Sequence, residues 1–554
     1  MKRVLLSLLI FSLTLVVFHT YFRSGFPYTN DGENHLARFA NYKIALKEGQ
    51  FPPRFAPNLM NHYGYPVFNF NYPLPNLLSV PFSLIKVNPE TTFKIISIMS
   101  FIGGLLGVYK LLHSERKSLF IIVIGMVLFG IQPYIVNLIL FRGSMGELLA
   151  ASLLPWVFWS INELIKKQKP TLFTISISSL YLLSHNVTVL ISLPIILLFA
   201  VVKIFDNKNK KAVFAIFLNF FYSLALSLWF WLPALVEASQ TVVRDAGIAN
   251  HFFDHFATIN QLAFGQLGFG FSNPGPVDSL GFQLGISTLF VIWISSIILF
   301  KSFFKKVHVP TKILLWTTTV LILIFLQTPT SFYFWKLVPT LQIIQFPWRL
   351  SILLGALVPI LWAESSSLIS RNLKKVLLAL CFITVYVIGQ LKPVDFFHRN
   401  QIDYDLYPQS TSTQNENRTK EFTYLNIGDW QPRPLIEGVG ESTVSDWTGS
   451  HRTYSLSLET PSTIIEPTMK FSGWQTSVVS SDGKTRNVQY LNTELTQGRI
   501  AFELPIGTFL IHSTFTQWTP ARIIGNSITL ISVIALGFGY LKHRWTSSTT
   551  TKNG

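Results

Sequence analysis

The chain has 554 residues, of which 49% are hydrophobic and only 13% are charged. Soluble domains carry about 25% charged residues, so this composition excludes a chain built of soluble domains alone. The net charge of +17 would suit a nucleic-acid ligand. The basic residues lie between apolar runs, however, so membrane topology explains them without a nucleic acid. The single cysteine, Cys381, excludes an internal disulfide.

Apolar stretches follow one another along most of the chain. About twelve of them are long enough, or nearly so, to cross the ~30 Å bilayer core, which takes about 20 residues of helix. Two of them, 148–163 and 171–185, are short enough that we expect tilting. The stretches lie at residues 4–22, 93–112, 119–141, 148–163, 171–185, 187–205, 213–235, 284–300, 313–328, 350–370, 375–391 and 523–541. The sequence therefore predicts an α-helical polytopic membrane protein.

The segments between these stretches alternate in charge. If the N-terminus is cytoplasmic, then Lys2, Arg3 and every second segment after them are rich in Lys and Arg, and the acids there are few: Glu115, Glu163 and Asp206. The positive-inside rule then predicts both termini in the cytoplasm, with the bilayer as partner. We expect the membrane to be the plasma membrane. No small-residue cleavage site follows the first stretch, so we expect it to be retained.

Four segments are expected outside, at 23–92, 236–283, 329–349 and 392–521. The last has soluble composition and alternates with period two, as in Tyr454, Leu456 and Leu458, with a turn at 481–484 that indicates a hairpin. We therefore predict three parts. Residues 1–391 form a transmembrane module with a long first outer loop at 23–92, residues 392–521 an extracytoplasmic antiparallel β domain, and residues 522–554 a last transmembrane helix and cytoplasmic tail.

The first outer loop carries the residues best suited to chemistry. If the chain is helical from about Gly32, then Asp31, His35 and Arg38 share one helix face. Arg54 and Tyr65 follow among many aromatic residues. The alternative interpretation is an interfacial amphipathic helix with an aromatic belt, since polar residues at a membrane surface cost little.

Further polar residues lie near the expected outer ends of spans. Glu147 begins a span and is either a site residue or a carboxylate favoured by the helix dipole. The pair His185 and Asn186 is either functional or a solvated turn. Arg142 and Arg349 have guanidinium groups that bind phosphate bidentately, and Arg349 lies where a lipid phosphate would be.

The order of these motifs resembles that of GT-C membrane glycosyltransferases. Asp31 is followed by His35-Leu36-x-Arg38, then by a Gly-x-x-Pro and a Tyr-Pro-x-Pro. Matches continue at Arg142–Glu147 with Pro155, His185-Asn186, Phe230–Pro233 to Glu237, and Phe346–Arg349. The chain resembles bacterial membrane proteins labelled 6-pyruvoyl-tetrahydropterin-synthase-related and YfhO-like proteins. The pterin label implies no pterin chemistry, because no Cys/His zinc cluster is visible in the sequence.

This resemblance implies glycosyl transfer at the outer face, with inversion at the anomeric carbon. The donor would be a sugar on a polyprenyl phosphate, the acceptor an extracytoplasmic cell-envelope glycan, lipid or protein, and Asp31 the general base. A divalent cation is left open, since there is no specific metal motif. The other residues implied to bind substrate are Glu33, His35, Arg38, Arg54, Tyr65, Arg142, Glu147, His185, Asn186 and Arg349.

Two other functions are open. A transporter or flippase for a lipid-linked saccharide would usually show internal repeats and ionisable residues buried in its spans. Here the ionisable residues of interest lie near the expected outer rim, which favours chemistry on a membrane-embedded substrate. The third possibility is a non-catalytic scaffold with an outer carbohydrate-binding domain.

Overall fold

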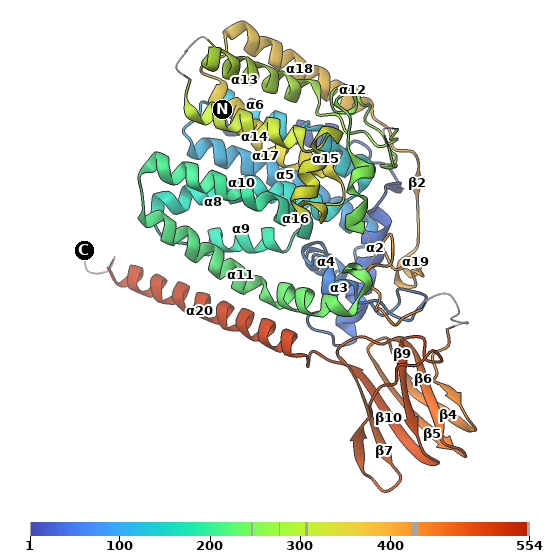
Figure 1. Ribbon diagram of the computed structural model, residues 1–554. Helices are drawn as coiled ribbons and strands as arrows, with labels where there is room; N and C mark the ends of the chain where they lie inside the picture. Colours follow the sequence, from blue (N-terminus) through green and yellow to red (C-terminus); the bar gives the residue numbers. More distant parts are fainter. Residues whose placement is uncertain (1, 245–247, 276, 305–308, 424–429, 551–554) are drawn as a thin grey trace. The chain divides into compact units, whose positions relative to one another are not determined.

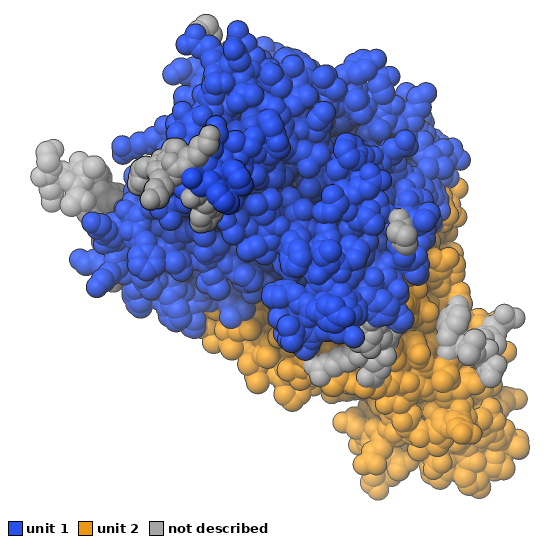
Figure 2. All heavy atoms as spheres, turned by 45° about the horizontal axis from the view of Figure 1, so that its top comes forward, with its two compact units in different colours: residues 1–33, 90–224, 247–398 blue, residues 34–89, 225–246, 399–554 orange. Residues whose placement is uncertain are grey.

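The computed structural model describes residues 2–244, 248–275, 277–304, 309–423 and 430–550. It is mostly helical, with antiparallel sheets near the C-terminus. The chain divides into two compact units, each made of three separated segments (Figure 2). Unit 1 contains residues 1–33, 90–224 and 247–398, and unit 2 contains residues 34–89, 225–246 and 399–554. The predicted division near residue 391 stays a prediction.

Unit 1 is a helical bundle in which α8 and α10 lie side by side and α17 is enclosed by its neighbours (Figure 1). A short antiparallel pair, β1 (Phe26–Pro27) and β2 (Phe396–Phe397), belongs to the same unit. The helices of unit 1 are α1 (Lys2–Val17), α5 (Pro89–Ser114), α6 (Leu119–Gly130), α7 (Pro133–Asn137), the π-helix η1 (Leu138–Arg142), α8 (Met145–Lys167), α9 (Leu172–Leu182), α10 (Asn186–Asn207), η4 (Ile248–His255), α12 (Ile259–Phe264), α13 (Ile286–Phe304), α14 (Thr311–Phe325), η5 (Pro329–Ser331), α15 (Phe332–Leu337), α16 (Pro339–Gln342), η6 (Pro347–Leu350), α17 (Ser351–Ser365) and α18 (Arg371–Gln390).

Seven of the described helices are long and apolar enough to cross a membrane, or up to nine if two bent pairs each form one span. The predicted count of twelve is therefore not confirmed. The three expected spans left over correspond to α1, α9 and α13, which are too short for the same criterion or do not meet it. A polytopic, mostly helical membrane protein is nevertheless what the structure shows.

One of the bent pairs has a local cause that also shapes the candidate site. The stretch predicted at 119–141 is broken after α6 by Pro133, and the axis bends by 43°. Gln132 caps the second part by accepting a hydrogen bond from the amide of Ile135 at 2.9 Å. The segment ends in the π-helix η1 and then in Gly143, whose φ of +62° is favourable for glycine.

Unit 2 combines the first outer loop with the C-terminal sheets. The helix predicted from about Gly32 is confirmed as α2, and α11 begins in unit 1 and ends in unit 2. Its helices are α2 (Gly32–Lys47), α3 (Val67–Phe70), α4 (Leu74–Leu84), α11 (Lys211–Glu237), η2 (Ala238–Gln240), η3 (Val242–Arg244), α19 (Gln401–Asp405) and α20 (Pro520–Thr550). Its strands are β3 (Leu435–Glu437), β4 (Gly440–Trp447), β5 (His451–Leu458), β6 (Ser462–Met469), β7 (Trp474–Ser480), β8 (Thr485–Asn487), β9 (Arg499–Leu504) and β10 (Gly507–Phe515).

The strands form two antiparallel sheets that pack face to face (Figure 1). One has the order β4-β5-β10-β7-β8 and the other the order β3-β6-β9. The predicted period-two positions Tyr454, Leu456 and Leu458 are buried in the core between the sheets. The predicted hairpin is confirmed as the β7–β8 pair, where Gly483 turns the chain with a φ of +77°. The antiparallel β prediction is therefore confirmed.

A second core in unit 2 joins segments that are far apart in sequence. Aromatic and aliphatic side chains of the first outer loop, such as Phe55, Tyr63 and Phe68, pack with Trp474 and Phe515 of the sheets. Phe55 stacks on Phe515 with their ring centroids 5.4 Å apart. Residues 34–89 of the predicted outer loop are thus part of the same folded unit as the β sandwich, whereas residues 23–33 belong to unit 1.

Candidate functional site

Glu147, in the first turn of α8, is the centre of a buried polar group in unit 1. Its carboxylate accepts two hydrogen bonds from Arg142, from Nη1 to Oε2 at 2.7 Å and from Nη2 to Oε1 at 2.8 Å. The hydroxyl of Tyr134 donates to Oε2 at 2.5 Å. Burying a carboxylate is costly unless it is paired and hydrogen-bonded, and here both conditions hold.

A second guanidinium approaches the same carboxylate. Nε of Arg349 lies 3.5 Å from Oε1 of Glu147, an ion pair but not a close hydrogen bond. Arg349 stacks over the ring of Phe346 at 4.7 Å, and Arg142 stacks over Trp348 at 4.9 Å. Tyr134, Arg142, Glu147 and Arg349 are hereafter the Glu147 cluster. It holds two cations around one buried anion, so it carries a surplus positive charge.

Asp31 is the carboxylate at the accessible side of this cluster. Its Oδ2 lies 4.0 Å from Nη2 of Arg142, and its side chain is 41% exposed, against 2% for Glu147. The backbone holds it there, because the amide of Asn30 donates to the carbonyl of Phe141 at 3.1 Å and that of Asp31 to the carbonyl of Arg142 at 2.8 Å. The π-helical ending of η1 thus fixes both the guanidinium and the backbone that carries Asp31.

The arrangement can separate two chemical roles. With Asp31 ionised, two carboxylates balance two guanidiniums. If Asp31 accepts a proton, the cluster carries one net positive charge, which is best stabilised by an anion that arrives or develops beside it. A base exposed to solvent and a buried cationic wall are what deprotonation of a hydroxyl and departure of a phosphate need.

Three other predicted residues belong to unit 1. His185 is buried and caps α10, with its Nδ1 accepting from the amide of Thr188 at 3.2 Å. The charges of Glu147, Arg349 and Arg142 act on its imidazole, so it belongs to the same electrostatic environment. Asn186 begins α10, and Glu33 lies in the first turn of α2, next to Asp31. Their binding roles stay predictions.

Three more predicted residues belong to unit 2 and have contacts there. Nε of Arg38 donates to Oγ1 of Thr411 at 3.0 Å. The hydroxyl of Tyr65 lies 2.7 Å from Oγ of Ser412 and accepts from the amide of Asn417 at 2.8 Å. His35 is buried in α2, its ring centroid 6.2 Å from that of Tyr72. Arg38 and Tyr65 therefore anchor the 411–417 segment, and substrate roles for all three stay predictions.

Arg54, also in unit 2, belongs to another buried charge group. Its Nη2 donates to the carbonyl of Trp229 at 2.5 Å, and Arg522 donates to Oε2 of Glu237 from Nη2 at 2.9 Å. Glu237 also accepts from Asn69 at 2.9 Å and from Thr519 at 2.7 Å. Burial and the charge of Arg522 lower the pKa of Arg54 to about 9. Arg54, Asn69, Glu237, Thr519 and Arg522 are hereafter the Glu237 cluster.

The sequence interpretation missed several members of these clusters. Tyr134 carries no functional signal of its own, although the pair Gln132-Pro133 that precedes it interrupts an apolar run and marks a break. Trp348 and Glu237 appeared only as parts of longer motifs. Arg522 was assigned to a span end and carried no local signal. Residues that meet only after folding leave little trace in a single sequence.

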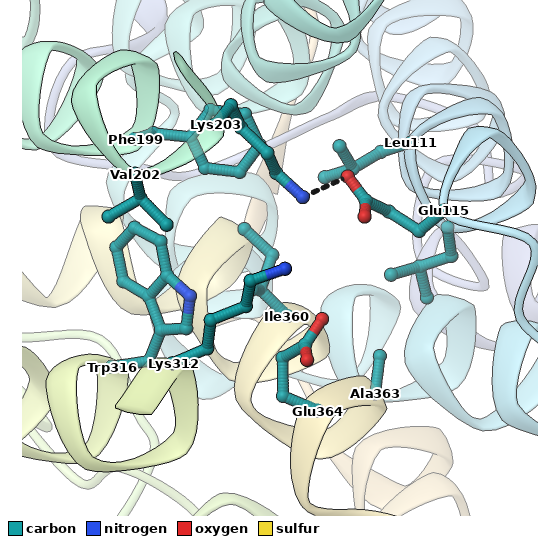
Figure 3. A pocket seen from close by; sticks show the side chains of 11 residues that line it. Leu111, Glu115, Phe199, Val202, Lys203, Lys312, Trp316, Ile360, Ala363 and Glu364 are labelled. Atoms are coloured by element: carbon teal, nitrogen blue, oxygen red, sulfur yellow. Dashed lines mark hydrogen bonds and ion pairs between the residues drawn. The ribbon is translucent and has the colours of Figure 1, made fainter. Parts of the chain in front are cut away.

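The ends of four helices in unit 1 form another charged group, part of which Figure 3 shows. Lys203 pairs with Glu115 there. Beside this pair, Lys312 lies 2.6 Å from Asp206 and Lys117 lies 3.1 Å from Glu364. The cavity among them has a volume of about 10 Å³, room for about one water molecule. Each cation in it has an anion, and the helices meet in segments predicted to face the cytoplasm. The group is suited to holding helix ends together and is too small for a sugar.

Metal chemistry has no candidate centre in the described part of the chain, where no three His, Cys, Asp or Glu side chains come together as a metal site. The weaker grouping of His251, Asp254 and His255 in the second outer loop contains one contact, 3.2 Å between Nδ1 of His251 and Oδ2 of Asp254. The metal requirement is therefore not assigned from the structure.

A family model described as "6-pyruvoyl-tetrahydropterin synthase related domain; membrane protein" matches residues 68–394. A curated relative from Lactococcus lactis subsp. cremoris (strain MG1363), described as an uncharacterized protein, is 26% identical over 336 residues. That alignment covers 58% of this chain and 53% of the relative, so the chain spans about half the length of the curated relative it matches.

Two solved structures align with most of the chain. The mycobacterial arabinofuranosyltransferase AftD matches with a TM-score of 0.37 and 13% identity, covering 71% of this chain and 27% of AftD. The Archaeoglobus fulgidus oligosaccharyltransferase, in complex with Zn and sulfate, matches with a TM-score of 0.35 and 15% identity, covering 74% of this chain and 58% of that one. TM-scores of this size do not establish a common fold.

Proposed function

Since the chain belongs to the membrane-protein family described as related to 6-pyruvoyl-tetrahydropterin synthase and has several long apolar helices, we propose that it is an integral membrane glycosyltransferase. The donor is a sugar linked to a polyprenyl phosphate, and the acceptor is a hydroxyl of an extracytoplasmic glycan, lipid or protein. The observation that carries the proposal is the half-exposed carboxylate of Asp31 beside the buried guanidinium of Arg142.

The reaction assigns one step to each side of the site. Asp31 takes the proton from the acceptor hydroxyl, and the acceptor oxygen forms a bond to the anomeric carbon. The bond between that carbon and the phosphate oxygen breaks, and the electron pair leaves with the polyprenyl phosphate. A single displacement of this kind inverts the anomeric centre. A positioned base contributes typically about 10²–10⁴-fold in rate.

Arg142 and Arg349 serve the leaving group differently. Arg142 is held by two hydrogen bonds to Glu147, so it supplies a fixed charge with little freedom to move. Arg349 lies 3.5 Å from Glu147 and donates from Nη1 to the carbonyl of Ile344 at 3.2 Å. Its contact with the carboxylate is therefore weaker than that of Arg142, and its other nitrogens would face a phosphate oxygen at lower cost. Preorganised cations in a site that excludes water stabilise a developing phosphate charge without first having to be ordered.

The test uses full-length protein in liposomes with donors in which the sugar of a polyprenyl-phosphate hexose or pentose carries the label. We expect protein-dependent transfer of label to a water-soluble or lipid acceptor, release of polyprenyl phosphate, and inversion seen by NMR of the product. Label that crosses the bilayer with its sugar–phosphate bond intact would identify a flippase and overturn the proposal. Failure to transfer sugar from every one of these donors would also overturn the proposal.

The proposed location is the plasma membrane, with both termini cytoplasmic and the site outside. Reporter fusions after Lys169, Lys211 and Arg371 should then read cytoplasmic, because these residues lie in basic segments. A fusion near Gly440, in β4, should read external. An external signal at any of the first three positions would contradict this orientation.

A further inference from the structure

Unit 2 contains an open pocket of about 380 Å³ that the chemistry above does not use. Its walls come from the segment after α11, from residues 419–421, from the connection between β6 and β7, and from the residues just before α20. The volume lies in the range of small-molecule sites, about 300–1,000 Å³.

Aromatic side chains form much of the pocket wall. Trp518 is 72% exposed, an unusual position for an indole unless it contacts a membrane or a ligand. Tyr490 is half-buried, and its hydroxyl is held 3.0 Å from Oγ1 of Thr476. Trp474 is buried beneath them in the core. Flat aromatic faces next to a polar wall suit a ring that is apolar on its faces and polar at its edge, as a sugar is.

The polar groups of the wall both donate and accept. Gln240 accepts a hydrogen bond from Oγ of Ser472 at 2.8 Å through Oε1, and the side chain of Gln475 is exposed. Nε1 of Trp474 and Oγ1 of Thr419 are buried atoms of lining residues with no hydrogen-bond partner among the described residues. A buried donor or acceptor without a partner costs about 1–3 kcal/mol, so a hydrogen bond to a water or to a ligand that reaches these two atoms would be favourable.

The charge of the pocket is balanced. Its ionisable lining residues of opposite sign are Lys470 and Glu421. An anion such as a phosphate headgroup would be bound best where cations are in excess, as in the Glu147 cluster. Amides, hydroxyls and indoles with little net charge suit an uncharged ligand rich in hydroxyl groups.

We propose that this pocket binds an uncharged saccharide, and that this saccharide is part of the acceptor. The acceptor role rests on the glycosyl transfer proposed above, whereas saccharide binding does not. The substrate class that follows is a neutral glycan or glycolipid headgroup, recognised by stacking on Trp518 and Tyr490 and by hydrogen bonds to Gln240 and Gln475.

The test is saturation-transfer difference NMR on the full-length protein in nanodiscs. The probes are the methyl glycosides of glucose, galactose, mannose and N-acetylglucosamine, with glycerol 1-phosphate as a stand-in for a lipid headgroup. We expect signal from at least one neutral glycoside. Trp518→Ala and Gln475→Ala should each weaken binding about fivefold to tenfold, the change that loss of one such contact gives. Ile506→Ala, 62% exposed in the β9–β10 turn outside the pocket, is the matched control.

The outcomes separate the pocket from the reaction. No glycoside signal, equal signal in wild type and both pocket variants, or signal from glycerol 1-phosphate alone would overturn the pocket assignment. Saccharide binding that Trp518→Ala removes while transfer stays at the wild-type rate would overturn the acceptor role. If Trp518→Ala and Gln475→Ala weaken glycoside binding as expected but the protein transfers no sugar, the pocket assignment would be supported and the glycosyltransferase function refuted.

Discussion

The Glu147 cluster and the Glu237 cluster are similar buried charge groups that differ in what lies beside them. In each, a buried glutamate accepts hydrogen bonds from one arginine and one hydroxyl. A second arginine lies 3.5 Å from the carboxylate of Glu147, whereas Arg54 senses the charge of Glu237 without a direct contact. In the Glu237 cluster the glutamate and both arginines are at most 2% exposed, and Arg522 also donates to the carbonyls of Thr516 and Ser472. In the Glu147 cluster the neighbouring Asp31 is 41% exposed.

This difference shows why a buried ion pair by itself is weak evidence for function. Breaking such a pair is costly wherever it occurs, because the remaining charge is left without a partner. What distinguishes the Glu147 cluster is the accessible carboxylate next to it and the looser contact of Arg349. The Glu237 cluster instead ties α11, the first outer loop and the start of α20 together within unit 2.

The sharpest test of the comparison is Asp31→Asn. The amide keeps the size of the side chain but cannot take a proton, so we expect transfer to fall about 10²–10⁴-fold. Stability should change by less than about 0.5 kcal/mol, because the side chain is partly exposed. Asp395→Asn, an exposed carboxylate of the same unit, should keep the wild-type rate. Full activity of a normally expressed Asp31→Asn protein would remove Asp31 from the mechanism and direct attention to Glu33 or Glu147.

The opposite pattern is expected for Glu237→Gln. Arg522 would lose its charged partner at a fully buried position, which lowers the free energy of unfolding by about 3–5 kcal/mol. Thermal unfolding of the purified protein in detergent should show the loss, and transfer per folded molecule should change little. Glu441→Gln, exposed in β4, is the control. Equal unfolding temperatures for the two variants would contradict a structural role for the Glu237 cluster.

Arg349 tests whether the looser cation serves the phosphate. Arg349→Ala should reduce transfer about 10²–10³-fold, the usual cost of one lost donor to a developing charge. Arg349→Lys keeps the positive charge but cannot bind a phosphate bidentately, so its transfer rate should lie between those of the wild type and Arg349→Ala. A fall in kcat indicates contact with the departing phosphate, and a rise in KM indicates contact with the bound donor. Arg23→Ala, exposed in unit 1, is the control; an unchanged rate for Arg349→Ala would exclude Arg349 from the site.

Sequence patterns predicted what depends on local periodicity. The helix from Gly32, the hairpin at 481–484 and the alternating strand positions follow from spacings of a few residues, and the structure has all three. The span count differed because hydropathy does not fix helix length: α1, α9 and α13 are shorter than a span needs, and Pro133 also divides one predicted stretch into two helices.

Such local patterns could not predict contacts between segments that are far apart in the sequence. Arg522 and Glu237 are separated by 285 positions and meet only because unit 2 brings three segments together. The shared core of Phe55 and Phe515 depends on the same assembly. Asp31 and Arg142 were each predicted for a site, but their approach depends on backbone hydrogen bonds to a π-helix that composition does not indicate.

The smallest expected effect concerns Tyr134, the member of the Glu147 cluster that the sequence did not reveal. Tyr134→Phe removes a hydroxyl that donates to Glu147 at 2.5 Å and accepts from Nη1 of Arg142 at 3.1 Å. Glu147 keeps both hydrogen bonds from Arg142, so stability should fall by only about 1.5 kcal/mol, the lower end for a bond to a charged group.

Tyr181→Phe is the matched control, since its hydroxyl donates to the neutral Ser192 at 2.5 Å in the same unit. Both variants should lower the unfolding temperature, but only Tyr134→Phe should also slow transfer, by less than about tenfold, because it loosens the guanidinium that faces Asp31. Equal transfer rates for the two variants would mean that the Glu147 cluster, like the Glu237 cluster, only holds the fold together.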